Sequence, residues 1–427
     1  MYFIVIIILA VISPDLSYSQ NYWVIKESPT TRNLTEVFFL DSSTGWIAGD
    51  SGTIMKTTNN GSSWIQQNSG TFNNIVDIFF LNERYGWALS WGIFPDSLNF
   101  LGTVILSTSD GGNNWSRKNF DEVNTYMKSI FYFDTLYGFT GGAPGAIYKT
   151  TNGGNRWNVT QIDTAVEIIL PVECIKFYDT QKGFASGGFR DLAGCMWKTT
   201  NGGQIWSIDI VGPEPLNDLY LINTSRILAI GGDFEYGSSY VNSFNSGNTW
   251  FYDTLGIYGV ARSLDFRTPN EVWVSVGNNF SMSSDTGNSW TSFPTPDSLR
   301  LEDICFTDSL NGWGVGYEGV LMQYNKTISS VYSFSDNYTP ESIDLYQNYP
   351  NPFNPVTKIS YFLSKSQDVN LAVYNSLGEI IATPVNEYRH SGYHSFEFKS
   401  GNLPSGVYFY KLTADGISKI RKMLLVK

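Results

Sequence analysis

The chain has 427 residues, of which 16% are aromatic and 15% are charged, with 40 glycines and a net charge of −12. This length allows two or three domains, and the composition favours a turn-dense β protein over a helical or disordered one. The acidic balance argues against nucleic acid and anionic membranes as partners, because binding them requires clustered cations. Residues 1–340 hold 18 basic and 32 acidic side chains, whereas residues 341–427 hold 9 and 7, which predicts a domain boundary near residue 340.

The N-terminus predicts export. Ten apolar residues, Phe3–Ile12, are followed by the small residues Ser17 and Ser19, which suit cleavage before Gln20. The apolar run is too short to span a bilayer, so residues 1–19 are interpreted as a signal peptide and no transmembrane span is expected in the mature chain. No Lys or Arg precedes the run, which departs from the usual signal pattern. The alternative, a buried first strand, lacks the alternation of a half-buried strand.

A short motif then recurs six times, with 40 to 51 residues between successive tryptophans. Each copy fits Ser/Thr-x-Asp/Asn-x-Gly-x-x-Trp, as in KTTNGGNRW (149–157) and KTTNGGQIW (198–206). A unit of this length repeated so often indicates a repeat fold. The Asp or Asn and the Trp of the six copies are Asn59 and Trp64, Asp110 and Trp115, Asn152 and Trp157, Asn201 and Trp206, Asn245 and Trp250, and Asp285 and Trp290.

Each unit predicts four short antiparallel strands joined by tight turns. The first strand and turn of the first unit recur at residues 78–87, 130–139, 175–184, 219–228, 264–273 and 304–313. Seven units predict an all-β, seven-bladed β-propeller with four-stranded blades over residues 20–328. The seventh unit lacks its last strand, and Trp23 lies one repeat length before Trp64. We therefore expect an N-terminal strand around Trp23 to complete the seventh blade and close the ring.

The chemistry of the repeated motif predicts a structural role. Asn and Asp accept hydrogen bonds from nearby amides, Gly adopts positive φ, and Trp buries a large surface. Only Asp110 and Asp285 are acids, and the other four copies have Asn. A general acid or a metal ligand could not be exchanged for Asn in this way, so we interpret the motif as hairpin structure and assign it no catalytic residue.

The six copies resemble Asp-box motifs, also called bacterial neuraminidase repeats. The fuller pattern, F-x-D-x-x-x-G-W/F followed by K-T-T-N-G-G-x-x-W, is similar to propellers of the photosystem II assembly and stability factor family over residues 21–328. The resemblance implies that the hairpins lie on the face away from a functional site. Sialidases and xyloglucanases share the motif, so the resemblance leaves the function open.

Enlarged loops at one mouth of the channel are the expected ligand site. They place aromatic residues beside acids and an arginine, a mixture that suits sugar or peptide binding. The candidate ligand-binding residues are Trp91, Phe94, Asp96, Arg190, Asp191, Glu235, Tyr236, Tyr317 and Glu318. For each of them the alternative is an ordinary solvated loop residue.

Three functions stay open for the propeller. The favoured one is a secreted or cell-surface, non-catalytic binding module for an unknown glycan or protein ligand. The second is a glycoside hydrolase of sialidase-like or xyloglucanase-like type, and the third is an assembly or scaffolding factor. A sialidase needs three arginines with a tyrosine and a glutamate, and the candidates are Arg190, Arg262 and Arg300 with Tyr236 or Tyr258. Two acids or three arginines converging at the channel mouth would favour catalysis.

After a polar linker at residues 329–340, residues 341–427 alternate like short strands and predict a small Ig-like β-sandwich. The segments QNYPNPFNP, VYNSLGE and LPSGVYFYKL are similar to the type A sorting domain of the Bacteroidetes type IX secretion system. The resemblance implies Sec export, passage through the type IX machinery, cleavage by a sortase-like peptidase, and an extracellular or outer-membrane location. The alternative is an Ig-type binding module. The sorting-motif residues are Asn348, Pro350, Asn351, Pro352, Phe353, Asn354, Pro355, Gly406 and Tyr408.

Few residues suit a metal or disulfide. The chain has three cysteines, so complete pairing is impossible and buried free thiols are favoured. It has only two histidines and no CxxC pair, so neither a metal site nor a cofactor is expected. The cysteines and histidines concerned are Cys174, Cys195, Cys305, His390 and His394.

We also expect the mature chain to be a monomer.

Overall fold

The computed structural model describes residues 22–93, 101–163, 170–324 and 343–426, with short gaps in the last range. The described chain is all β, as predicted, and its helical residues form only three 3₁₀ turns, η1 (Asp50–Gly52), η2 (Pro296–Ser298) and η3 (Tyr317–Gly319). None of these helices is long and apolar enough to cross a membrane. The predicted signal peptide (residues 1–19) and linker (329–340) lie outside the described residues.

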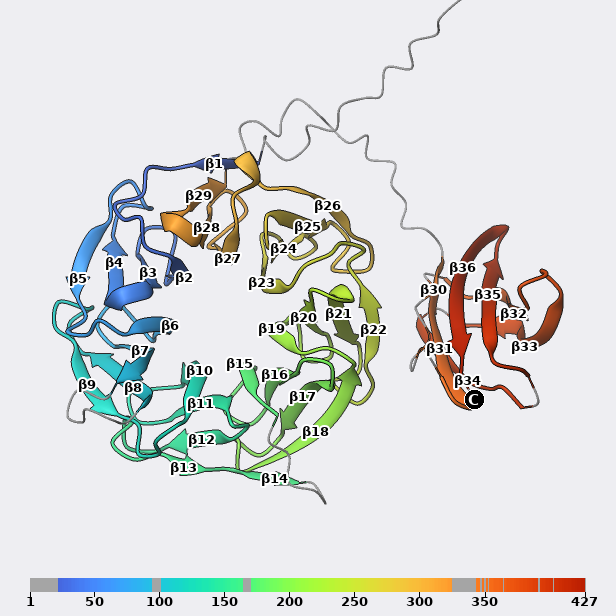
Figure 1. The fold of residues 1–427 in the computed structure, drawn as a ribbon, viewed down its shortest axis with the longest axis horizontal. Helices are drawn as coiled ribbons and strands as arrows, with labels where there is room; N and C mark the ends of the chain where they lie inside the picture. Colours follow the sequence, from blue (N-terminus) through green and yellow to red (C-terminus); the bar gives the residue numbers. More distant parts are fainter. Residues whose placement is uncertain are drawn as a thin grey trace, which may run out of the picture.

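Seven sheets of the described chain stand in a ring around a central channel, each with its first strand innermost (Figure 1). We call these sheets blades one to seven in chain order. The strands of blades one to three are β2 (Leu34–Phe39), β3 (Gly45–Gly49), β4 (Thr53–Thr57) and β5 (Ile65–Asn68); β6 (Asn74–Phe80), β7 (Gly86–Ile93), β8 (Leu101–Thr108) and β9 (Ser116–Asn119); and β10 (Tyr126–Tyr132), β11 (Gly138–Ala143), β12 (Ile147–Thr150) and β13 (Asn158–Val159).

The remaining blades continue the pattern. Blade four differs, because β14 (Gln161–Asp163) adds a fifth strand that pairs parallel with the outer strand β18. The strands of blades four to seven are β15 (Val172–Phe177), β16 (Gly183–Phe189), β17 (Ala193–Thr199) and β18 (Ile205–Gly212); β19 (Leu216–Leu221), β20 (Ile227–Asp233), β21 (Gly237–Ser243) and β22 (Phe251–Thr254); β23 (Ala261–Phe266), β24 (Val272–Val276), β25 (Asn279–Ser283) and β26 (Thr291–Pro294); and β27 (Leu301–Phe306), β28 (Gly312–Gly316) and β29 (Leu321–Tyr324).

The N-terminal strand β1 (Trp23–Ile25) supplies the outer strand of blade seven. It pairs antiparallel with β29, and Trp23 lies opposite Tyr324. Trp23 is 1% exposed and stacks on Phe280 of blade six at 5.0 Å between ring centroids. The two ends of the propeller therefore share one sheet, which removes an open edge.

Aromatic contacts fill the space between blades. Trp46 of blade one stacks on Phe80 of blade two at 3.5 Å, and Trp87 of blade two stacks on Tyr132 of blade three at 3.7 Å. In five blades the second strand begins with glycine, and the aromatic residue after it contacts an aromatic residue of the next blade. Large buried aromatic surfaces of this kind dominate the stability of a core.

The antiparallel order places the turns on two opposite faces. On one face the repeated motif connects the third and fourth strands, and its backbone bonds to the turn between the first and second strands; for example, the Asn60 amide donates to the Ser43 carbonyl at 3.0 Å. On the other face the loop after the second strand contacts the segment that precedes the first strand of the same blade. For example, the Asp50 amide donates to the Asn33 carbonyl at 2.9 Å. We call these the Asp-box face and the loop face.

The C-terminal region forms two further sheets that share one core. Ile359 and Tyr361 of the first sheet and Leu371, Tyr410 and Met423 of the second lie in the same buried cluster. This arrangement is a two-layer β fold, and its classification as Ig-like stays a prediction. The first sheet contains β30 (Ile343–Leu345), β31 (Val356–Leu363) and β34 (Gly392–Lys399), and the second contains β33 (Ile380–Arg389), β32 (Gln367–Tyr374), β35 (Gly406–Ala414) and β36 (Ile417–Leu425).

Candidate functional site

All seven inner strands contain a β-bulge near their start, where the register to the second strand shifts by one residue. A bulge opposes two residues to one and re-aims their side chains. As a result, two consecutive residues of each inner strand line the channel cavity. The bulge residue and its successor are Thr35 and Glu36, Val76 and Asp77, Lys128 and Ser129, Glu173 and Cys174, Asn217 and Asp218, Arg262 and Ser263, and Glu302 and Asp303.

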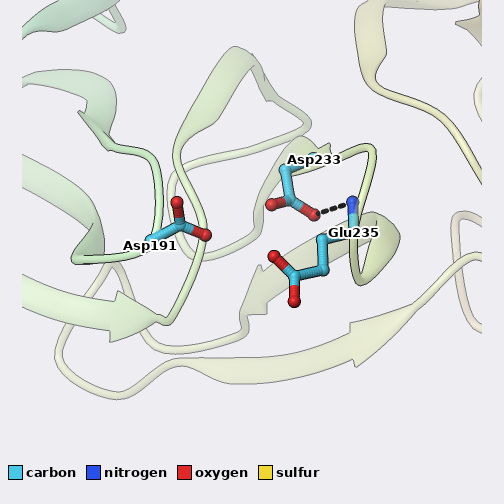
Figure 2. A group of neighbouring side chains, drawn as sticks. All are labelled: Asp191, Asp233 and Glu235. Carbon is cyan, nitrogen blue, oxygen red and sulfur yellow. Dashed lines mark hydrogen bonds between the residues drawn. The ribbon is translucent and has the colours of Figure 1, made fainter.

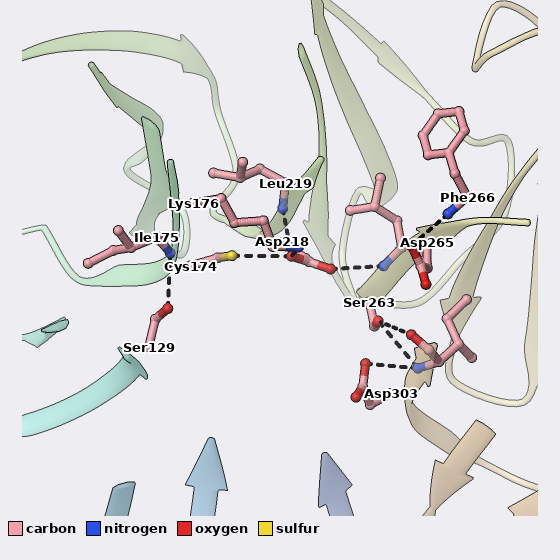
Figure 3. Close-up of polar contacts among 12 residues, drawn as sticks. Ser129, Cys174, Ile175, Lys176, Asp218, Leu219, Ser263, Asp265, Phe266 and Asp303 are labelled. Atoms are coloured by element: carbon pink, nitrogen blue, oxygen red, sulfur yellow. Dashed lines mark hydrogen bonds and ion pairs between the residues drawn. The ribbon is translucent and has the colours of Figure 1, made fainter. Parts of the chain in front are cut away.

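The successor residue joins neighbouring blades by hydrogen bonds. The Asp77 carboxylate accepts from the Ile130 amide at 2.6 Å, and the Asp303 carboxylate accepts from the Val37 amide at 2.7 Å. Figure 3 shows the same pattern farther round the ring, where acceptors on three more blades bond the next inner strand at 3.0 to 3.3 Å. Because a buried amide needs a partner, this contact explains why a polar residue occurs at this position of the channel wall. These three acceptors are Ser129, Asp218 and Ser263.

The channel encloses a cavity of 680 Å³, within the usual size of ligand pockets. Seven carboxylates line it, and three cationic side chains oppose them. Each cation is paired with one of the carboxylates, in the pairs Lys128–Glu173, Lys176–Asp218 (3.1 Å) and Arg262–Glu302 (3.8 Å).

Four acids of the cavity are left without a cationic partner. Among the described residues, no ion pair involves Glu36, Asp77, Asp265 or Asp303. The last three accept backbone amides, which provide dipoles but no full charge. The cavity is therefore acidic and has the capacity to compensate additional positive charge.

Burial raises the pKa of these carboxyl groups. It raises the pKa of Asp77 and of Asp265 to about 7, against the opposing effect of the amides that they accept. It raises the pKa of Asp303 to about 6. It also raises the pKa of Glu36 well above its usual range, and the negative charge of Asp303 raises the pKa of Glu36 further. Protons held near neutral pH can leave when a cation enters, because an opposite charge favours the ionised form.

The cavity wall divides into an aromatic and a polar arc. Phe38, Phe79 and Phe131 of blades one to three follow one another, with ring centroids 5.8 and 5.5 Å apart. Aromatic faces attract cations and also offer apolar surface. An aromatic arc in an acidic cavity therefore suits an organic cation better than a bare metal ion. The equivalent positions of blades four to seven are Lys176, Tyr220, Asp265 and Cys305.

The predicted loop residues Asp191 and Glu235 come together with Asp233 on the loop face (Figure 2). Carboxylate oxygens of the three side chains lie within 4.8 Å of one another. Asp233 is 1% exposed, and its Oδ1 accepts the amides of Glu235 and Tyr236 at 2.9 and 2.6 Å. Oxygen ligands at this spacing could hold a hard cation such as Ca²⁺. The prediction that the chain has no metal site did not anticipate this group.

The other predicted ligand residues are spread around the loop face. Trp91 lines the cavity, but its Nε1 donates to the Met127 carbonyl at 2.6 Å, so it also joins blades two and three. Tyr317 and Glu318 lie in η3 of blade seven, where the Arg300 guanidinium covers the Tyr317 ring at 4.1 Å. Phe94 and Asp96 lie outside the described residues. The described members of the set therefore do not gather into a single site.

Two of the arginines considered for a sialidase lie close together, and the third lies on another blade. Arg262 and Arg300 both form ion pairs with Glu302, at 3.8 and 3.4 Å. Arg190 lies on the loop of blade four, and the candidate tyrosines Tyr236 and Tyr258 project from blade five with exposures of 63% and 80%. A sialidase-like arginine triad therefore stays a prediction.

The six Asp-box turns share one set of hydrogen bonds. In every copy the Ser or Thr hydroxyl donates to Oδ1 of the Asn or Asp at 2.6–3.2 Å. The Gly amide donates to that hydroxyl at 2.7–3.0 Å. The amide before the Trp donates to the same Oδ1 at 2.9–3.0 Å. Since Asn and Asp both have Oδ1 as an acceptor, the geometry explains why they interchange.

The described residues of the sorting motif are tied to the last strand and the core of the C-terminal region. Asn348 is 2% exposed, and its Nδ2 donates to the Thr357 hydroxyl at 2.9 Å. The Phe353 amide donates to the Leu424 carbonyl at 2.9 Å, and the Tyr408 hydroxyl donates to the Pro404 carbonyl at 2.8 Å. Asn351, Asn354, Pro355 and Gly406 are also described, whereas Pro350 and Pro352 are not.

All three cysteines are free thiols, as favoured from the sequence. Cys195 is buried, but Cys174 and Cys305 are only partly buried and line the channel. The Cys174 thiol donates to Asp218 Oδ1 at 3.2 Å, and burial raises its pKa. A raised pKa disfavours the reactive thiolate, so we assign these thiols no chemistry.

Sequence reasoning missed the acids of the channel. A signal was present, since the residue before the second core-facing apolar residue of each inner strand is Glu, Asp, Ser or Cys in all seven units. The alternating pattern of a strand assigns this position to either face, and only the bulge shows that it faces the channel.

Comparisons with known proteins agree with this architecture. Residues 71–215 match the family described as photosynthesis system II assembly factor YCF48, and residues 347–427 match the secretion system C-terminal sorting domain. A search of curated proteins finds no match. The chain thus combines a YCF48-like propeller with a type IX secretion sorting domain, which confirms both resemblances.

Three solved structures show the same fold at low identity. YCF48 bound to a D1 peptide is 21% identical, with a TM-score of 0.56 over 71% of this chain and 96% of that one. YCF48 from Cyanidioschyzon merolae is 18% identical, with a TM-score of 0.57 over 72% and 99%. The GH74 enzyme of Niastella koreensis is 13% identical, with a TM-score of 0.55 over 96% and 75%. The sorting domain indicates export to the cell surface or outer membrane.

Proposed function

We propose that this chain is an exported, non-catalytic binding propeller that holds a cationic peptide segment of a protein ligand in its central channel. The observation that carries the proposal is the group of four carboxylates without cationic partners in a cavity of 680 Å³. Buried ionised acids are costly unless they are compensated, so a bound cation would stabilise them.

The shape and lining of the cavity favour a side chain of Arg or Lys as the bound group. Its stem would lie against the arc of Phe38, Phe79 and Phe131, and its charge would reach Asp265 and Asp303. The YCF48 structure with a bound peptide supports the idea that this fold accommodates a peptide. A neutral glycan would offer these four acids no positive charge.

Export gives the proposed ligand its setting. The sorting domain implies interaction with the type IX secretion machinery. Cleavage by a sortase-like peptidase and a monomeric mature form are part of the proposal. The propeller would then present its loop face to peptides outside the cell or at the outer membrane.

The test uses fluorescein-labelled hexapeptides that contain arginine, lysine or glutamate. We expect the full chain to bind the arginine and lysine peptides by fluorescence anisotropy and not the glutamate peptide. Asp265→Asn should weaken binding about tenfold, the loss expected for one charged hydrogen bond. The matched control is Asp110→Asn, the same substitution in an exposed Asp-box turn, which should bind like the wild type.

Binding should also strengthen as the pH rises. The Asp77, Asp265 and Asp303 carboxyls lose their protons between about pH 6 and 7, and only the ionised forms attract a cation. Equal affinity for the arginine and glutamate peptides, or an unchanged affinity in Asp265→Asn, would contradict the proposal.

A second candidate, glycoside hydrolysis, rests on the Asp191, Asp233 and Glu235 group. Retaining glycosidases hold two carboxyl groups roughly 5 Å apart, and the oxygens of this group lie within 4.8 Å. We would screen the chain on a glycan array and incubate every bound glycan to detect cleavage. Cleavage that disappears in Glu235→Gln would favour the hydrolase, and binding without cleavage would favour a lectin-like role.

A further inference from the structure

The outer strand of blade five touches the C-terminal domain. Arg421 of β36 donates from Nη2 to Oδ2 of Asp253 on β22 at 3.0 Å. The same guanidinium donates from Nε to the carbonyl of Leu345 at 3.0 Å, which fixes it within its own domain. Figure 1 shows the C-terminal sheets beside β22 at the rim of the ring. The arginine therefore connects two domains through one planar group.

The two partners of this ion pair have unequal surroundings. The side chain of Asp253 is 4% exposed, whereas that of Arg421 is 43% exposed. Burial raises the pKa of Asp253, and Arg421 partly opposes this effect. A buried carboxylate that loses its cation is left uncompensated, but the exposed arginine would be hydrated. Loss of the arginine should therefore weaken the contact between the domains more than loss of the aspartate.

Blade four offers a comparison within the same molecule. Asp209 occupies the same repeat position as Asp253, three residues after the Asp-box tryptophan. Asp209 is exposed and accepts only from Trp250 Nε1, at 3.1 Å, among the hydrogen bonds of the described residues. The repeat alone therefore does not explain a buried acid at this position.

The charges of the two domains are complementary. Residues 1–340 carry a net charge of 18 − 32 = −14, and residues 341–427 carry 9 − 7 = +2. The strand β36 includes Lys419, Arg421 and Lys422, so its basic residues lie on the element that faces blade five. Complementary charge guides docking and fixes its register.

We propose that the rim of blade five is a docking surface for the chain's own C-terminal domain, held by the Asp253–Arg421 pair, and that the domain stays bound after the connecting chain is cut. Cleavage of the linker would then not release the sorting domain by itself. Release would require a second step, in which a competing surface takes Arg421 away from Asp253. This inference does not depend on the ligand of the channel.

The experiment uses the full chain with a site-specific protease site placed within residues 329–340. After cleavage, the two fragments of the wild type should elute together in gel filtration at micromolar concentration. Arg421→Gln should raise the dissociation constant roughly 30-fold or more, because it leaves the buried carboxylate unpaired. Asp253→Asn should have a smaller effect, because it leaves only a hydrated arginine.

Two controls separate docking from folding. Lys365→Gln removes an exposed ion pair to Asp415 within the C-terminal domain, and Asp209→Asn changes the equivalent residue of blade four. Both should leave the fragments together, and all variants should show the far-UV spectrum of the wild type. Wild-type fragments that separate after cleavage, or Arg421→Gln fragments that stay together with wild-type affinity, would overturn the proposal.

Discussion

The Asp-box turns and the channel both contain aspartate side chains, but those of the turns are exposed and those of the channel are buried. In an Asp-box turn such as that of Asp110, the carboxylate is exposed and accepts hydrogen bonds from its own turn, which lowers its pKa. In the channel the Asp303 carboxylate is buried, bonds to a different blade and has a raised pKa. The comparison teaches that hydrogen bonds within a turn stabilise the carboxylate without any cation. Burial among other acids destabilises the carboxylate, so that a bound cation would stabilise it.

The largest effect should come from filling the space at an Asp-box glycine. Gly203 has a φ of 68°, and a Cβ there would lie 2.3 Å from Phe139 of the preceding blade. Gly203→Ala therefore combines backbone strain with overpacking and should cost roughly 4 kcal/mol in the free energy of unfolding. Urea denaturation measures this, with Gly378→Ala as control, where a Cβ meets no atom. A loss equal to that of the control would show that the turn does not lock blade to blade.

The next effect concerns the channel and depends on pH. The folded pKa of Asp303, about 6, lies above its unfolded value, so its contribution to stability is complete below about pH 4 and is lost as the pH rises through 6. Relative to the wild type, Asp303→Asn should gain on the order of 3 kcal/mol between pH 4 and pH 7. Thermal unfolding across this range measures the difference. A stability difference that does not change with pH would mean that burial does not raise the pKa of Asp303.

A middle-sized effect is expected for the hydroxyl of the Asp box. The Thr150 hydroxyl donates to Asn152 and accepts the Gly154 amide, so it joins both ends of the turn. Thr150→Val keeps the shape and removes every hydrogen bond of the hydroxyl, leaving the buried Gly154 amide unpaired, which should cost about 2 kcal/mol. Chemical denaturation tests this, and Thr150→Ser should restore most of the stability. A Ser variant as weak as the Val variant would point to packing of the methyl group instead.

The smallest effect is expected when the Asp of an Asp-box turn is replaced by Asn. Asp285→Asn keeps the Oδ1 acceptor used in all six turns, so the free energy of unfolding should change by less than about 0.5 kcal/mol at pH 7. The matched change Asp265→Asn in the channel should alter the binding of a cationic peptide. If Asp285→Asn impaired peptide binding as strongly, the site would lie on the Asp-box face and the proposed channel site would be wrong.

Much of the fold was predictable because it depends on residues close together in the chain. The Asp-box spacing gave the period of the repeat, and the position of Trp23 one period before Trp64 indicated the closing strand that pairs with β29. The site was less predictable. Asp191 and Glu235 were selected and do meet, yet Tyr317 and Glu318 lie on blade seven, since the radial placement of a loop follows from packing.

The sequence alone determined the all-β repeat, the hairpin chemistry and the sorting segment, because each is written in a short run of residues whose bonds are local. The tertiary structure decided which side chains meet. It brought Asp77, Asp265 and Asp303 into one cavity through the inner-strand bulges, and it set Arg421 against Asp253 across 168 residues. Such contacts depend on the ring closure and on domain docking, whose geometry no short segment encodes.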